Sequence, residues 1–193
     1  MLDLSNLLVP LSTLSKQITI LANKAPTANL LQSTTFWAQL LVSLAHDLLA
    51  LPRFDSEDDV SHETASQMAM REAIRVAALI FVSTIICRCS GDELYCARNY
   101  GGRARNVLTA TNDSDWVGLK ELRLWVLILC GMVEDDRTWF VEQIKHTMRD
   151  SRLDTWDEAL RTLSQIAWID SLTAVDAATL ALEVEERLMD DTF

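Results

Sequence analysis

Three thiols stand close together in the sequence, and thiolates are ligands that zinc accepts readily. Cys87, Cys89 and Cys96 have the spacing C-x-C-x6-C, whereas structural zinc sites usually take four ligands, in pairs two to four residues apart. On a helix, Cys87 and Cys89 would point about 200° apart and could not bind one ion together unless the helix ended there. We therefore predict no metal site. The four cysteines of the chain also lack the framework of a small disulfide-rich secreted domain.

Other residues with catalytic potential are scattered. His46 adjoins Asp47, but neighbours on a helix do not face each other, and the sequence contains no nucleophile elbow, phosphate-binding glycine loop or dinucleotide fingerprint. The segment NYGGRAR (99–105) could offer backbone amides, Arg103 and Arg105 to an anion, although a surface loop is the simpler interpretation. Without a set of nucleophile, base or metal ligands, we predict a protein that is not an enzyme and needs no cofactor.

The charge balance argues against nucleic-acid partners. The formal net charge is −11, and residues 1–52 contribute two acids and two lysines, so the excess lies entirely in the remainder of the chain. Nucleic-acid affinity comes largely from Lys and Arg, and so we predict no direct nucleic-acid contact. Neither a signal peptide nor a membrane-spanning apolar run is evident. We expect a soluble intracellular protein.

The elements that must position these residues are helices. Only 5 Gly and 3 Pro occur in 193 residues, and leucine, alanine and charged residues dominate. We predict an all-α fold, a single irregular bundle of about seven or eight helices. Expected helices cover about 4–23, 27–51, 61–88, 103–111, 118–130, 136–149, 155–167 and 172–189.

Proline, serine and an acidic cluster in 52–63 indicate a linker. We therefore divide the chain into an N-terminal helical hairpin, 1–52, that packs on an all-helical core, 53–193. In the helix at 61–88, the residues at spacings of three and four predict one buried face, and the apolar residues between them predict a second. The first face consists of Met70, Ile74, Ala77, Phe81 and Ile85, and the second of Leu79, Val82 and Ile86.

The segment 119–144 predicts a helical hairpin. We expect Gly131 to end its first helix, because glycine adopts the left-handed cap conformation without steric cost. Asp135 or Asp136 would then cap the second helix. Trp125 and Trp139 would lie on successive helices and serve most simply as core residues. Farther on, Thr155 with Glu158 three residues later has the pattern of a capping box.

Two segments, REAIRVAALIFVS (71–83) and the stretch 119–170, together resemble the C-terminal helical region of fungal zinc-cluster transcription factors, the fungal-specific transcription factor domain. The resemblance covers roughly half of the chain. Its motifs are an Arg-Glu-Ala-hydrophobic-Arg start, an LWxLxxGG-like helix, a WF helix, a W-x-E helix and a WxD ending. The matching positions are Arg71, Glu72, Ala73, Ile74 and Arg75; Trp125 and Gly131; Trp139 and Phe140; Trp156 and Glu158; and Trp168 and Asp170.

The resemblance implies a non-catalytic regulatory domain in the nucleus, acting through contacts with proteins or a small-molecule effector. Arg71 and Arg75 would pair with acids of neighbouring helices or line a ligand pocket. Trp125 and Trp139 join them as candidates for pocket or regulatory contacts, while Phe81, Trp156 and Trp168 are candidate core anchors. The six-cysteine DNA-binding cluster of the complete family is missing, because only four differently spaced cysteines are present. The chain would therefore be a fragment or a stand-alone regulatory half.

Two other functions remain open. One is an interaction module, such as a homodimer, with no transcriptional role. An exposed apolar stripe on the neutral, leucine-rich residues 1–51 would indicate it. The other is a small-molecule-binding protein with a site between its helices.

Overall fold

All regular structure in the described part of the chain is helical, which confirms the predicted all-α class. The computed structural model describes residues 62–90 and 100–190, a short helical stretch at 45–50, and the single positions 9, 13, 16 and 41. Most of the predicted hairpin 1–52, most of the linker 52–63, and Cys96 lie outside the described residues.

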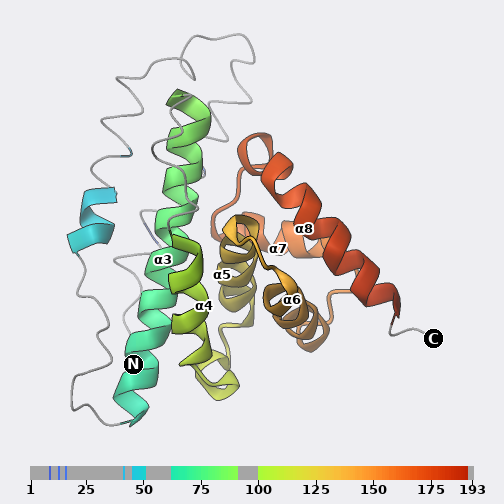
Figure 1. Cartoon of the computed structure of the whole chain (residues 1–193), viewed down its shortest axis with the longest axis horizontal. Coiled ribbons are helices and arrows are strands. Elements are labelled where there is room, and N and C mark those ends of the chain that lie inside the picture. Colours follow the sequence, from blue (N-terminus) through green and yellow to red (C-terminus); the bar gives the residue numbers. More distant parts are fainter. Residues whose placement is uncertain are drawn as a thin grey trace.

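Seven helices have defined bounds in this part of the chain, six α-helices and one 3₁₀ helix (Figure 1). In chain order they are α3 (His62–Ser90), α4 (Gly101–Thr109), the 3₁₀ helix η3 (Asp113–Trp116), α5 (Lys120–Val133), α6 (Thr138–Asp150), α7 (Trp156–Ile166) and α8 (Asp170–Asp190). None of these helices is long and apolar enough to cross a lipid bilayer.

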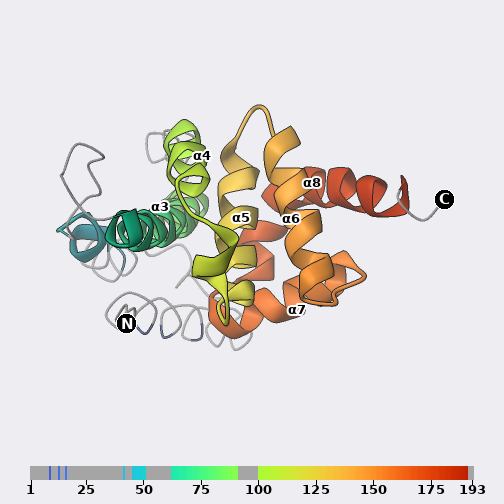
Figure 2. The same cartoon turned by 90° about the horizontal axis from the view of Figure 1, so that it is seen from below.

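Helix α5 is the centre of the bundle. It packs against α3 and α4 on one side and against α6, α7 and α8 on the other, an arrangement visible in Figures 1 and 2. All its residues from Leu124 to Met132 are buried. A helix that is apolar all round belongs inside a core, and α5 occupies that position.

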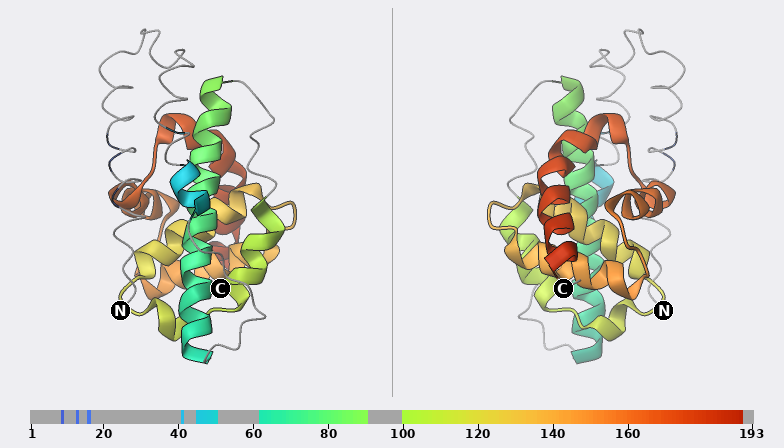
Figure 3. Two further views of the ribbon diagram at one scale, coloured as in Figure 1. Left: turned by 90° about the vertical axis from the view of Figure 1, so that its left-hand side faces the viewer. Right: turned by 90° about the vertical axis from the view of Figure 1, so that its right-hand side faces the viewer.

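Helix α3 is the longest element and runs along the molecule beside α5 (Figure 3). The predicted first face is buried throughout, and on the second face Leu79 and Val82 are buried while Ile86 is partly buried. The helix ends at Ser90, two residues beyond the expected bound at 88. From the N-terminal segment, Leu41 and Leu48 are buried in the same core.

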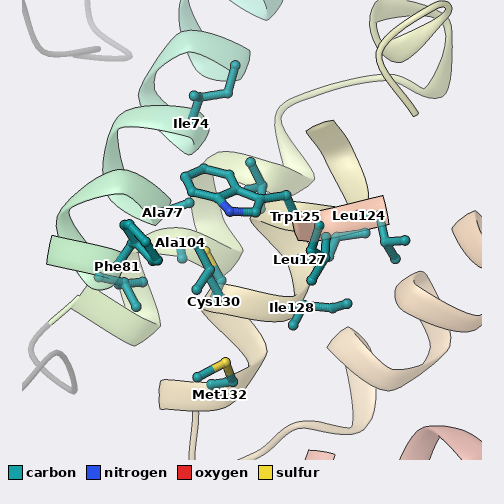
Figure 4. Packing of buried hydrophobic residues seen from close by; sticks show 14 of the residues in the cluster. Ile74, Ala77, Phe81, Ala104, Leu124, Trp125, Leu127, Ile128, Cys130 and Met132 are labelled. Atoms are coloured by element: carbon teal, nitrogen blue, oxygen red, sulfur yellow. The ribbon is translucent and has the colours of Figure 1, made fainter. Parts of the chain in front are cut away.

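The main core contact joins α3, α5 and the connection between α7 and α8. The Trp125 indole of α5 extends toward Ala77 and Phe81 of α3 (Figure 4), and the rings of Phe81 and Trp125 are 6.3 Å apart. Trp125 Nε1 donates a hydrogen bond of 2.6 Å to the Ala167 carbonyl oxygen. The other proposed anchors, Trp156 and Trp168, are also buried. A buried indole N–H usually finds a partner. The bond from Trp125 connects α5 with the segment between α7 and α8.

The prediction that Gly131 ends its helix is wrong. α5 continues to Val133, and Gly131 is buried inside it. A Cβ atom at Gly131 would lie 3.2 Å from Phe140 Cβ and 3.3 Å from Leu180 Cδ2. Glycine is therefore present because α6 and α8 approach the backbone of α5 closely.

The helix starts follow local sequence signals more closely. At the start of α6 the N-cap residue is Arg137, not Asp135 or Asp136 as predicted, and its side chain makes no capping hydrogen bond. Asp136 still satisfies a helix amide from one position earlier, because the Thr138 amide donates to Asp136 Oδ1 over 3.2 Å. At α7 the Glu158 amide donates to Thr155 Oγ1 over 3.3 Å. The Glu158 carboxylate accepts from the Asp154 amide, at 2.8 Å, instead of the Thr155 amide that a capping box would use.

Candidate functional site

The buried charges of α3 form the first notable polar cluster. Glu72 and Arg75 stand three residues apart on one face of the helix and are only 2% and 3% exposed. Arg75 Nε donates to Glu72 Oε2 and Arg75 Nη2 to Glu72 Oε1, both over 2.7 Å. This bidentate geometry is the strongest form of the ion pair. It offsets part of the large cost of taking both charges out of water.

A second arginine reaches the same carboxylate from α4. Arg103 Nη2 lies 2.8 Å from Glu72 Oε1, and Arg103 Nε donates to that oxygen over 3.1 Å. Arg103 remains 42% exposed. Arg75 Nη1 also donates to the Leu48 carbonyl oxygen at 3.4 Å. We call Glu72, Arg75 and Arg103 the α3–α4 cluster; it joins two helices and the N-terminal segment.

The chemistry of this cluster is that of a fixed ion pair. Guanidinium groups stay protonated in proteins and cannot serve as acids or bases. The carboxylate of Glu72 is occupied by two arginines at hydrogen-bond distance. The three side chains carry a formal net charge of +1, partly exposed at Arg103. The cluster can therefore hold α3 and α4 in a fixed orientation, but it cannot transfer protons.

A second cluster lies where α4 meets the loop between α5 and α6. The guanidinium carbon of Arg105 is 5.9 Å from the ring centroid of Trp139, within the range of a cation–π contact. Arg105 Nη1 is 3.8 Å from Asp136 Oδ2. The ring of Trp139 stands edge-on to that of Phe140, at 4.9 Å. We call Arg105, Glu134, Asp136 and Trp139 the α4–loop cluster.

Two carboxyl groups of the α4–loop cluster have pKa values shifted in opposite directions. Burial raises the pKa of Glu134, with smaller contributions from Asp135 and Asp136, against the opposing effect of Arg105. Glu134 Oε1 is buried without a hydrogen-bond partner in the described part of the chain. Hydrogen bonds from the side chain and backbone of Thr138 lower the pKa of Asp136.

The thiol next to this region is not a nucleophile. Cys130 is fully buried in α5, and burial, followed by the charge of Glu134, raises the pKa of the thiol far above its ordinary value. Thiols react as thiolates, so Cys130 stays protonated and inert. Its place is in the packing between α5 and its neighbours (Figure 4).

Helix α4 connects the two clusters. Arg103 and Arg105 are two residues apart and therefore point in different directions, one to α3 and the other to the α5–α6 loop. The anion site considered for NYGGRAR would have used these same arginines. In the structure both are engaged by acids of this chain.

The four candidate contact residues have different surroundings. Arg71 is half-buried on α3, and Arg75 belongs to the α3–α4 cluster. Trp125 is inside the core, bonded to Ala167, while the half-buried Trp139 belongs to the α4–loop cluster. Arg75, Trp125 and Trp139 thus contact three different sets of partners.

Glu72 was named from the sequence as part of the Arg-Glu-Ala motif and Arg103 as a possible anion contact, but their pairing was not predicted. For Glu72 a signal existed, because an acid three residues before an arginine in an apolar run predicts a buried pair. For Arg103 there was none, since its partner lies 31 residues earlier in the chain. Glu134 gave no such signal either, because the acidic run to which it belongs resembles a solvated loop.

Among the described residues, no group of three or more His, Cys, Asp or Glu side chains is placed to hold a metal ion. No family model matches the chain, and comparison with curated proteins and with solved structures gave no match. Function must therefore be inferred from the clusters and surfaces of the chain itself.

Proposed function

We propose that this chain is a non-catalytic, helical regulatory domain that acts in transcriptional control through contacts with protein partners or a small effector. It would correspond to the regulatory region that fungal zinc-cluster transcription factors carry apart from their DNA-binding module. Nuclear residence follows from the same resemblance. The chain would act without touching nucleic acid itself, in keeping with its net charge of −11.

The observation that carries the proposal is that the motifs behind the resemblance pack on one another. The tryptophan of the LW motif, Trp125, bonds the carbonyl of Ala167, directly before the WxD ending. The glycine of the same motif, Gly131, packs against Phe140 of the WF motif. Residues from distant motifs thus share one core, which gives a reason for their common occurrence and order.

The polar residues of these motifs also serve the fold. Glu72 and Arg75 of the Arg-Glu-Ala start neutralise each other inside α3. In the WxD ending, Trp168 Nε1 donates to Asp170 Oδ1 over 2.7 Å. Motif residues that are committed to internal pairing support a binding scaffold more than a catalytic centre.

A reporter assay tests the proposal. Residues 1–193, fused to a foreign DNA-binding domain, should change the transcription of a reporter relative to that DNA-binding domain alone. An acidic chain can alter transcription through charge alone, so the matched control is the variant F81A/W125A. Each of these truncations costs about 3–5 kcal/mol, enough together to unfold a typical domain, and the charge of −11 is unchanged.

Only a response that requires the folded chain supports the proposal. An unchanged reporter, at protein levels verified by immunoblot, would contradict it. An equal response from the folded chain and from F81A/W125A would contradict it as well, because charge would then be the cause.

The second candidate function is a protein-interaction module with no transcriptional role. The observation in its favour is the presence of exposed apolar side chains on α8, Leu182 and Met189. A folded-chain response in the reporter assay would exclude it, whereas a silent reporter together with a specific protein complex would establish it. For the homodimer version, light scattering at high concentration should show twice the monomer mass.

A further inference from the structure

Helix α8 lies at the edge of the described molecule (Figure 1) and presents two different faces. Its inner face is buried and consists of Thr173, Ala177, Leu180 and Val184. On the opposite side Leu182 and Met189 are 68% and 65% exposed. These two residues are seven apart, so they lie on the same side of the helix, about two turns from each other. Ala178, also exposed, is one turn before Leu182.

Two carboxylates stand between Leu182 and Met189 in the sequence and lie on either side of the apolar stripe in space. Glu185 and Glu186 follow Leu182 by three and four residues, and so they flank the apolar stripe on either side. Other charges of α8 are engaged with α6 and the loop before it: Arg187 with Glu142 at 3.5 Å, and Glu183 with Arg137 at 3.4 Å. In the described part of the chain, Glu185 and Glu186 have no ion-pair partner. We call Ala178, Leu182, Glu185, Glu186 and Met189 the α8 outer face.

The charge of this face decides between its candidate occupants. A second copy of α8 would bring Glu185 and Glu186 against their own counterparts, in a parallel or an antiparallel pair centred on them. Burying like charges against each other is destabilising, and the net charge of −11 adds long-range repulsion between copies. A helix with apolar residues flanked by lysine or arginine is complementary in both respects.

We propose that the α8 outer face binds a basic amphipathic helix of a partner protein. Leu182 and Met189 contact the apolar side chains of that helix, and the flexible methionine adapts to their shape. Glu185 and Glu186 pair with its lysines or arginines. This inference rests on the proposed function in one respect, that the chain acts through protein partners, and it names the surface and the chemistry of the partner.

Fluorescence anisotropy with the full chain tests this surface. The probe is a labelled synthetic peptide of about five helical turns, made of Leu, Lys and Ala with the leucines at spacings of three and four. The comparison peptide has the same composition in a scrambled order without an apolar face. The amphipathic peptide should bind at least about tenfold more tightly than the scrambled one, since a tenfold change corresponds to the loss of one good contact.

Two pairs of variants separate the α8 outer face from general attraction to an acidic protein. L182S/M189S should weaken binding about tenfold or more, whereas V117S, which removes a side chain that is 75% exposed elsewhere, should not. E185Q/E186Q should weaken binding and reduce its salt dependence. E121Q/D157N, which removes the same charge from exposed positions elsewhere, should have a much smaller effect.

Three results would overturn the proposal. The first is equal binding of the two peptides. The second is an equal loss of peptide affinity in the α8 variant and in its control, in either of the two comparisons. The third is a dimer, seen by sedimentation, that L182S/M189S dissociates, because a second copy would then occupy the face.

The peptide and reporter assays fail independently. A folded-chain reporter response without selective peptide binding would reject the α8 outer face alone. Selective peptide binding with a silent reporter would keep the α8 outer face and reject the transcriptional role.

Discussion

Glu72 shows how much a single buried residue can determine. Its carboxylate neutralises Arg75, which is nearly as buried, and also holds Arg103 of α4. Whether such a pair adds net stability over an apolar pair depends on the desolvation cost. Breaking it is a different matter, because an arginine would be left inside the protein without a counter-charge.

We therefore expect E72Q to lower the free energy of unfolding by about 3–5 kcal/mol. Urea denaturation of E72Q and of E121Q, an exposed acid-to-amide control, measures the difference. The double variant E72M/R75M should recover most of the loss, since it removes both charges and keeps the volume. Similar stability of E72Q and E121Q would show that the buried pair does not hold α3 and α4.

Glu134 provides a pH-dependent prediction. Its pKa in the folded protein lies above the ordinary value of 4.5, mainly because of burial. The folded protein therefore holds this proton more tightly than the unfolded chain does. The contribution of Glu134 to stability is fully present below pH 4.5 and is lost as the pH rises through the raised pKa.

The variant E134Q cannot lose that proton, and we expect it to be more stable than the parent at pH 7. Its advantage should shrink as the pH falls toward 4.5. Thermal unfolding between pH 4 and pH 8 follows the effect, with E121Q as the exposed control. An advantage of the same size at every pH would mean that ionisation of Glu134 is not its source.

At the scale of the elements, the packing of α5 against α6 and α8 depends on Gly131. A methyl group there would meet Phe140 Cβ, an atom close to the α6 backbone that cannot move by itself. Alanine favours a helix over glycine by up to about 1 kcal/mol, whereas overpacking a core costs roughly 1–3 kcal/mol. The steric cost should exceed the gain, because the methyl meets two neighbouring helices.

We predict that G131A is less stable than the parent and G102A more stable. Gly102 is an exposed helical glycine with nothing within 4 Å of an added Cβ. Its substitution by alanine should therefore raise the free energy of unfolding by about 0.4–1 kcal/mol. Both values come from the same urea titration. If G131A were stabilising like G102A, the close approach of the helices would not be what requires glycine.

The success of sequence reasoning followed the range of the interactions. The apolar period of α3 and the cap of α7 by Thr155 are local, and both were predicted from spacing alone. Gly131 was misassigned because its contacts with Phe140 and Leu180 come from two other helices. Arg103, the exposed arm of the α3–α4 cluster, was named only as a possible contact for an anion, since predicting its pairing with Glu72 requires knowing that α4 lies on α3. The candidate site was therefore predicted in part, at Arg75 and Trp139.

At the scale of the whole molecule, one core connects the helices from α3 to α8. Its central tryptophan, Trp125, contacts Phe81 of α3 and bonds the backbone that leads into α8. Elements that share a core in this way unfold together. A regulatory domain with such a core would transmit a change at one face, such as the α8 outer face, through the rotation of whole helices, because packed interiors resist gradual deformation.

Cooperativity of this kind makes a final prediction about unfolding. Far-UV circular dichroism reports the helices and tryptophan fluorescence reports the core, and the two urea transitions should coincide. W125F leaves the buried Ala167 carbonyl without its donor and should lower the free energy of unfolding by about 1–3 kcal/mol. Both transitions should then shift by the same amount. W139F, at a half-buried indole with no hydrogen bond in the described chain, should shift them less. If fluorescence changed before circular dichroism, the helices would not depend on the Trp125 core, and that core could not couple α8 to α3.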